Sequence, residues 1–125
     1  MPVVPIRQLT DDDCLPCCIA MVLDRTREEV LSWFEDEEFR STDVMIDVLA
    51  ARGFQVDEFK SPEQARGTRR IVALMKDGKE GHAVVMDEDG SIADPSSDEA
   101  TKKQLLDYAK LGLHVGRVFV IRKKD

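Results

Sequence analysis

The sequence has 125 residues, of which 42% are hydrophobic and 34% are charged. This length predicts one domain spanning residues 1–125, and the composition excludes disorder caused by low hydrophobicity. The net charge of −7 disfavours nucleic acid as a partner, because an acidic surface repels phosphate. No apolar run approaches the ~20 residues that span a bilayer, so we expect no membrane partner.

The N-terminus and the cysteines indicate the compartment. The segment Met1-Pro2-Val3-Val4-Pro5-Ile6 lacks the basic and long apolar regions of a signal peptide. The cysteines are Cys14, Cys17 and Cys18, and an odd, clustered set is a poor disulfide framework. A reducing cytoplasm is therefore predicted. Nothing in the sequence indicates an oligomeric state.

The first half of the chain has the signals of three helices. Residues 1–9 are expected to be extended, because proline disfavours a helix there. Asp11-Asp12-Asp13 offers N-cap residues for a helix running to about Leu23. Thr26-Arg27-Glu28-Glu29 has the form of a capping box, and Ser41-Thr42 opens a third helix that Gly53 ends.

The second half has the signals of a sheet. Turns are predicted at Asp77-Gly78 and Asp89-Gly90, and a helix is predicted over residues 98–111 with Leu105, Leu106 and Ala109 as its apolar residues. Short apolar or alternating runs predict strands at Phe54–Asp57, Ile71–Met75, His82–Met86, Ser91–Asp94 and Val115–Ile121. Helices followed by a mostly antiparallel sheet predict an α+β fold.

Four residues in this order suit nucleophilic catalysis. Cys14 falls in the first helical turn, where the helix dipole favours the reactive thiolate, although the preceding aspartates oppose it unless they face solvent or cap the helix. His82 offers a base, and Asp94 lies at or near the opposite position of a hairpin centred near Glu88, about 5 Å away in a regular ladder. The Gln8 amide, six residues before Cys14, suits an oxyanion donor.

The ordered pattern resembles the papain-like cysteine peptidases. It consists of Gln8-x5-Cys14, Cys18-Ile19-Ala20-Met21, Gly81-His82-Ala83-Val84-Val85 and Asp94-Pro95, and covers residues 6–96. Within that class it looks most like the bacteriocin-processing, double-glycine leader peptidases and their small stand-alone relatives.

This resemblance implies a compact papain-like fold with N-terminal helices packed on the sheet. It also implies a peptide or protein substrate, cut after a small residue such as glycine, and no cofactor or metal. The implied roles are Cys14 as nucleophile, His82 as base, Asp94 as its orienter and Gln8 in the oxyanion hole.

The sequence departs from the family pattern in two ways. Leu15 replaces the glycine usual in the family and could narrow the cleft, and no ATPase or membrane domain follows, so a transporter in the same chain is not expected.

Other functions remain open from the residues. Cys14-x-x-Cys17 has the spacing of metal ligands, but a structural zinc site needs a second pair, which the sequence lacks. Cys14-Leu15-Pro16-Cys17 also suits a thioredoxin-like thiol-disulfide oxidoreductase, although that fold needs a β-α-β stretch before the motif. A catalytically inactive papain-like domain that binds peptides is the third alternative. Cys17 and Cys18 are expected inside the first helix, and His114 on the surface.

Overall fold

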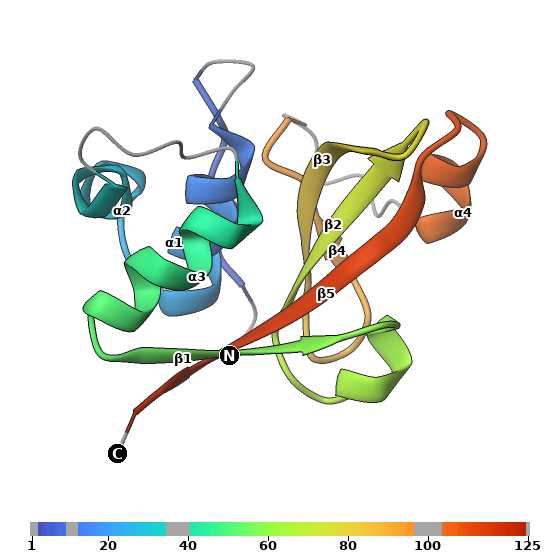
Figure 1. Ribbon diagram of the computed structural model, residues 1–125. Helices are drawn as coiled ribbons and strands as arrows, with labels where there is room; N and C mark the ends of the chain where they lie inside the picture. The colour runs from blue at the N-terminus through green and yellow to red at the C-terminus, as the bar shows by residue number, and fades with distance from the viewer. Residues whose placement is uncertain (1–2, 10–12, 35–40, 97–103, 125) are drawn as a thin grey trace.

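A computed structural model of the chain describes residues 3–9, 13–34, 41–96 and 104–124. Three helices come first and the strands follow, with one short helix before the last strand, much as the sequence predicts (Figure 1). Their bounds are α1 Cys14–Leu23, α2 Arg27–Phe34, α3 Thr42–Ala51, β1 Phe54–Phe59, a 3-10 helix η1 Pro62–Ala65, β2 Arg70–Lys76, β3 Lys79–Met86, β4 Ile92–Ala93, α4 Leu105–Ala109 and β5 His114–Lys123. None of the helices in the described ranges is both long enough and apolar enough to cross a membrane.

The strands form one five-stranded sheet in the order β1-β5-β2-β3-β4, and every neighbouring pair is antiparallel. Helices α1, α2 and α3 gather beside this sheet, and α4 lies at the far side of it from them (Figure 1). The fold is therefore α+β, with the N-terminal helices packed on an antiparallel sheet, as expected. The short β4 pairs with only the last part of β3, and among the described residues no other strand pairs with that edge of β3.

The helix boundaries follow the predicted capping residues. The Thr26 hydroxyl accepts the Glu29 N–H at 3.1 Å, and the Ser41 hydroxyl accepts the Val44 N–H at 3.3 Å. Gly53 takes a φ of +87° after α3, a backbone conformation that glycine adopts without steric cost. At α1 the expectation holds in part. Asp13 occupies the N-cap position, but its side chain makes no capping bond, and Asp11 and Asp12 lie outside the described residues.

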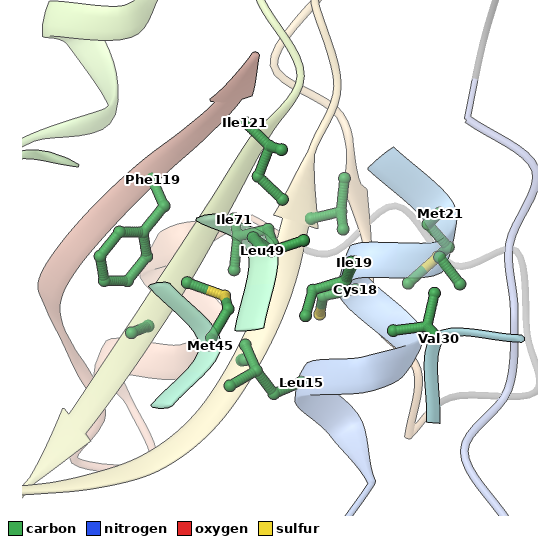
Figure 2. Packing of buried hydrophobic residues seen from close by; sticks show 14 of the residues in the cluster. Leu15, Cys18, Ile19, Met21, Val30, Met45, Leu49, Ile71, Phe119 and Ile121 are labelled. Carbon is green, nitrogen blue, oxygen red and sulfur yellow. The ribbon is translucent and has the colours of Figure 1, made fainter. Parts of the chain in front are cut away.

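Two hydrophobic clusters cover the two faces of the sheet. Side chains alternate between the faces of a strand, so Ile71 joins one cluster and Val72 the other. The larger cluster joins α1, α2 and α3 to β2, β3 and β5; its labelled members in Figure 2 are Leu15, Cys18, Ile19, Met21, Val30, Met45, Leu49, Ile71, Phe119 and Ile121. The smaller one contains Val72, Leu74, Val84, Met86, Tyr108 and Val118. The nucleophile candidate therefore starts a helix that is fixed to β3 by the larger core.

The structure corrects the predicted 98–111 helix. Residues 97–103 lie outside the described ranges, and the described helix covers only Leu105–Ala109. The expected apolar face is wrong in part. Leu105 packs against the smaller core cluster, but Leu106 is 62% exposed and Ala109 is also exposed, whereas Tyr108 is buried. The helix is about one turn and a half long, so the position of one large aromatic ring, rather than a hydrophobic stripe, decides which way it faces.

Leu15 also differs from expectation. Its side chain is only 2% exposed and lies within the larger cluster (Figure 2). It therefore points into the core between α1 and the sheet. The concern that Leu15 narrows a substrate cleft is wrong, because the residue replaces glycine on the buried side of the helix.

Leu15→Ala should lower the free energy of unfolding by about 2–5 kcal/mol, because it removes a buried side chain and leaves a cavity. The matched control is Leu106→Ala, the same change at an exposed leucine, which should alter stability by less than about 0.5 kcal/mol. Urea unfolding followed by circular dichroism measures both. Equal effects of the two substitutions would contradict the position assigned to Leu15.

Candidate active site

His82 and Asp94 form the centre of the site. His82 Nε2 lies 2.7 Å from Asp94 Oδ1, and the two side chains are 16% and 4% exposed. His82 belongs to β3, at a point beyond the residues with which β4 pairs, so one side of its backbone is not covered by the next strand. Gly81 falls in an irregularity of the β2–β3 ladder, between the paired residues Glu80 and His82.

The hairpin expectation is confirmed in its approximate form. The observed register pairs Val85 with Ala93, so counting on by one residue sets Asp94 against Val84. His82 is two residues from Val84 along the strand and shares its face. The two side chains therefore meet diagonally rather than across one rung, at a separation that a hydrogen bond spans.

Asp94 accepts hydrogen bonds on both carboxylate oxygens. Besides His82, Oδ1 accepts the Ser96 N–H at 2.8 Å and the Ser96 hydroxyl at 2.7 Å. Oδ2 accepts the Tyr108 hydroxyl at 2.6 Å. Burial alone would raise the pKa of Asp94, but the bonds from His82, Tyr108 and Ser96 hold it far below its usual range. The carboxylate is therefore ionised and fixed in place.

Cys14 lies beside His82 at the start of α1, half-buried. Burial would lower the pKa of His82, but hydrogen bonding to Asp94 and to Cys14, together with their charge, raises it to about 9. Because Nε2 faces Asp94, Nδ1 is the ring nitrogen left for the thiol. The structure thus places the His82 ring between the Cys14 thiol and the Asp94 carboxylate. In this arrangement the imidazole can exchange a proton with the thiol while the carboxylate holds the ring.

The charge of Asp13, next to Cys14 in the chain, is balanced by an arginine. Asp13 is 1% exposed, and its Oδ2 forms an ion pair with the Arg27 Nε at the start of α2. The same oxygen accepts the Leu9 N–H at 3.1 Å. The sequence left two outcomes open for the aspartates before Cys14, which were to face solvent or to cap the helix. Asp13 does neither. Its negative charge is instead compensated by the partly buried guanidinium of Arg27.

Gln8 reaches the same corner through its main chain. Its N–H donates to the Pro95 carbonyl at 2.8 Å, one residue beyond Asp94. The following residue, Leu9, is held by Asp13 as described above. Two hydrogen bonds thus fix the main chain of Gln8 and Leu9. One joins Gln8 to Pro95, which follows Asp94, and the other joins Leu9 to Asp13, which precedes Cys14. This arrangement brings the Gln8 backbone to the site.

The other cysteines lie inside the protein. All three cysteines are free thiols, and Cys17 and Cys18 are fully buried, as predicted. Burial, followed by the charge on Asp13, raises the pKa of Cys17 to about 12, and burial raises that of Cys18 well above its ordinary value. Within the described ranges, no group of three or more histidine, cysteine or acidic residues is placed to hold a metal ion.

Sequence reasoning missed two residues at this site. Tyr108 falls within the predicted 98–111 helix with no role assigned to it, and Arg27 is only the second residue of the predicted capping box. Neither has a motif, because each acts on a residue far away in the chain, at |i−j| of 14 in both cases. Burial of a polar side chain is the signal that identifies them, and it is visible only in three dimensions.

The fold is shared with solved peptidase domains. A double-glycine motif protease from an AMS/PCAT transporter, solved with a leader peptide, superposes with a TM-score of 0.73 at 18% identity over 98% of this chain and 92% of that one. The peptidase domain of ComA from Streptococcus, a bi-functional ABC transporter in quorum sensing, gives 0.69 at 14% identity over 95% and 97%. The same domain from Streptococcus mutans, bound to a small-molecule inhibitor, gives 0.65 at 13% over 94% and 98%.

No protein-family model matches the sequence, and no curated protein sequence matches it at a significant level. The similarity is therefore one of fold. The chain has the architecture of the double-glycine peptidase domains, as the sequence motifs lead one to expect.

NMR titration of His82 tests the electrostatics of the site. The His82 ring should titrate near pH 9, well above the ordinary value of about 6.5. The raised pKa means that charged His82 stabilises the folded state; this contribution is complete below about 6.5, the value in the unfolded chain, and is lost as the pH rises through about 9. A His82 ring that titrates below pH 7 in the folded protein would contradict the arrangement.

Arg27→Met should lower the free energy of unfolding by about 3 kcal/mol, because it removes the cation that balances a buried carboxylate. The control is Arg66→Met. Arg66 is 81% exposed and pairs with exposed Glu63, so its loss should cost less than about 1 kcal/mol. Thermal and urea unfolding measure both, and a fully stable Arg27→Met protein would show that the ion pair contributes nothing.

Proposed function

We propose that this chain is a cysteine peptidase in which residues 1–125 act as one papain-like domain. The observation that supports the proposal most is the position of His82, which bridges the Cys14 thiol and the Asp94 carboxylate. A nucleophile, a base and an orienting group in contact form the arrangement that activates a thiol for attack on a carbonyl.

In the proposed mechanism, His82 takes the Cys14 proton and the thiolate attacks the substrate carbonyl carbon. The tetrahedral oxyanion collapses, and His82 gives its proton to the leaving amine, which departs and leaves a thioester on Cys14. Water, deprotonated by His82, attacks the thioester and releases the acid. Asp94 keeps the imidazole in the orientation and tautomer that both steps need.

We propose that the oxyanion binds to the Cys14 N–H and the Gln8 side-chain amide. The first N–H groups of a helix have no intrahelical partner, so the N–H of Cys14 at the start of α1 is available to an anion. Gln8 is held on the neighbouring segment through its main chain. Preorganised donors of this kind stabilise charge that develops in the transition state.

The proposed substrate is a peptide or protein, cut after a small residue such as glycine. A structural neighbour was solved in complex with a leader peptide, which supports a peptide as ligand. The same residues would serve amide or isopeptide hydrolysis, or transfer of the acyl group to an amine. No cofactor or metal takes part in the proposed steps, and free cysteines suit a reducing cytoplasm.

The oxidoreductase alternative loses its basis in the structure. The sheet is entirely antiparallel, whereas a thioredoxin-like motif follows a β-α-β unit. Cys17, which would be the second redox thiol, is fully buried and holds its proton tightly, with a pKa of about 12. An inactive, peptide-binding domain of the same fold is the competing candidate, and activity separates it from a peptidase.

A proteome-derived peptide mixture, analysed by mass spectrometry after incubation, tests the proposal without a known substrate. The wild type should release new peptide ends, and His82→Ala should slow cleavage on the order of a thousandfold by removing the base. Asp94→Ala should slow it less, because Asp94 only orients the ring.

Cys14→Ala and Cys17→Ser form the matched pair of cysteine variants. The first should abolish cleavage, and the second should cleave at nearly the wild-type rate, because Cys17 has no role in the chemistry. Cleavage that persists in Cys14→Ala would exclude Cys14 as nucleophile. A wild type that binds peptides and cuts none would instead support the inactive binding domain.

A further inference from the structure

Tyr108 is the one residue of α4 whose side chain is buried, with 3% exposure. Its ring belongs to the smaller hydrophobic cluster, on the sheet face away from α1, α2 and α3. The ring also lies beside His82, with 6.5 Å between the ring centroids. Tyr108 therefore approaches the catalytic residues from the side of the sheet opposite to Cys14.

The hydroxyl of Tyr108 donates to Asp94 Oδ2 at 2.6 Å. Burial, together with the neighbouring Asp94 charge, raises the pKa of Tyr108 far above its usual range, so the phenol keeps its proton. A protonated phenol beside an ionised carboxylate has to donate to it. The Tyr108 hydroxyl is therefore the donor, and the Asp94 carboxylate the acceptor, at any pH at which the protein is active.

This bond occupies the carboxylate oxygen that His82 does not use. The terminal torsion of an aspartate is soft, so a carboxylate held at one oxygen can rotate about its Cβ–Cγ bond. With Tyr108 at Oδ2 and Ser96 at Oδ1, rotation would break hydrogen bonds at both oxygens. Ser96 is exposed, whereas Tyr108 is buried and rigidly packed.

We propose that Tyr108 is a positioning residue that fixes the plane of the Asp94 carboxylate and, through it, the His82 ring facing Cys14. The inference rests on the proposed function and adds a residue to it. Tyr108 contacts the carboxylate of Asp94. It acts on the reaction through a chain of contacts in which Tyr108 holds Asp94, Asp94 holds His82, and His82 serves Cys14.

The alternative is that Tyr108 is only a core residue. Phenylalanine would then serve equally well, since it fills the same space in the cluster and removes only the hydroxyl. Tyr108→Phe is therefore the substitution that separates the two roles. Leu106→Ala, at an exposed position on the same helix, is the control for disturbance of α4.

The readout is the rate at which iodoacetamide alkylates Cys14 at about pH 6, where an isolated thiol is almost entirely protonated. Peptide mass spectrometry resolves Cys14 from the buried cysteines, and no substrate is needed. We expect Tyr108→Phe to slow alkylation about tenfold, the usual value of one hydrogen bond to a charged group. Leu106→Ala should react at the wild-type rate. An unchanged rate in a folded Tyr108→Phe protein would overturn the proposal.

A double-mutant cycle with Asp94→Ala distinguishes positioning from packing. Asp94→Ala alone should slow alkylation, and adding Tyr108→Phe should slow it no further, because Tyr108 acts only through Asp94. If the double variant is alkylated more slowly than Asp94→Ala alone, Tyr108 has an effect that does not pass through Asp94. That result would overturn the inference. If Asp94→Ala itself reacts like the wild type, the proposed triad fails, and this outcome is distinct from a failure of Tyr108 alone.

A measurement on the wild type covers the case in which Tyr108→Phe does not fold. The Tyr108 hydroxyl proton should exchange slowly with water and give a resolved downfield NMR signal, as a buried short bond to a carboxylate requires. A hydroxyl proton in fast exchange with solvent would contradict the bond on which the inference depends.

Discussion

The buried carboxylate of Asp94 is the constraint on which the site depends. An ionised carboxylate removed from water is very unfavourable unless donors surround it, and Asp94 is 4% exposed with donors on both oxygens. Those donors come from β3, from the turn after β4 and from α4. Satisfying this one group therefore fixes the relative positions of three segments that are separate in sequence.

The hydrophobic core supplies the other half of the geometry. Cys14 is the first residue of α1, and the rest of that helix is packed against β3 by side chains such as Leu15 and Ile19 (Figure 2). The distance from thiol to imidazole is thus set by core packing rather than by contacts of Cys14 itself. Polar bonds orient His82, and apolar packing brings the Cys14 thiol to it. Close packing of this kind holds a site on rigid elements.

Features that depend on neighbouring residues were predictable from the sequence. Thr26, Ser41 and Gly53 mark helix ends through bonds or backbone angles within a few residues, and the turn at Asp89-Gly90 brings His82 and Asp94 close. The motif around these residues led to the fold that the solved peptidase domains confirm. The sequence analysis also anticipated the burial of Cys17 and Cys18.

Features that depend on distant partners were not predictable. The orientation of α4 follows from one tyrosine that bonds across the site, so Leu106 and Ala109, expected on the apolar face, are exposed. The effect of Asp13 on its neighbour Cys14 depends on Arg27 from another helix. Leu15 differed from expectation because a family comparison identifies the substituted position but not the direction of its side chain.

The central claim is that Cys14 and His82 act as one chemical unit. The pH dependence of Cys14 alkylation by iodoacetamide, measured in the wild type and in His82→Ala, tests it most directly. The account predicts rapid alkylation at acidic pH in the wild type, and loss of that reactivity in His82→Ala, because the imidazole holds the thiol proton. Identical pH profiles in the two proteins would mean that the histidine does not activate the cysteine, and would contradict the account.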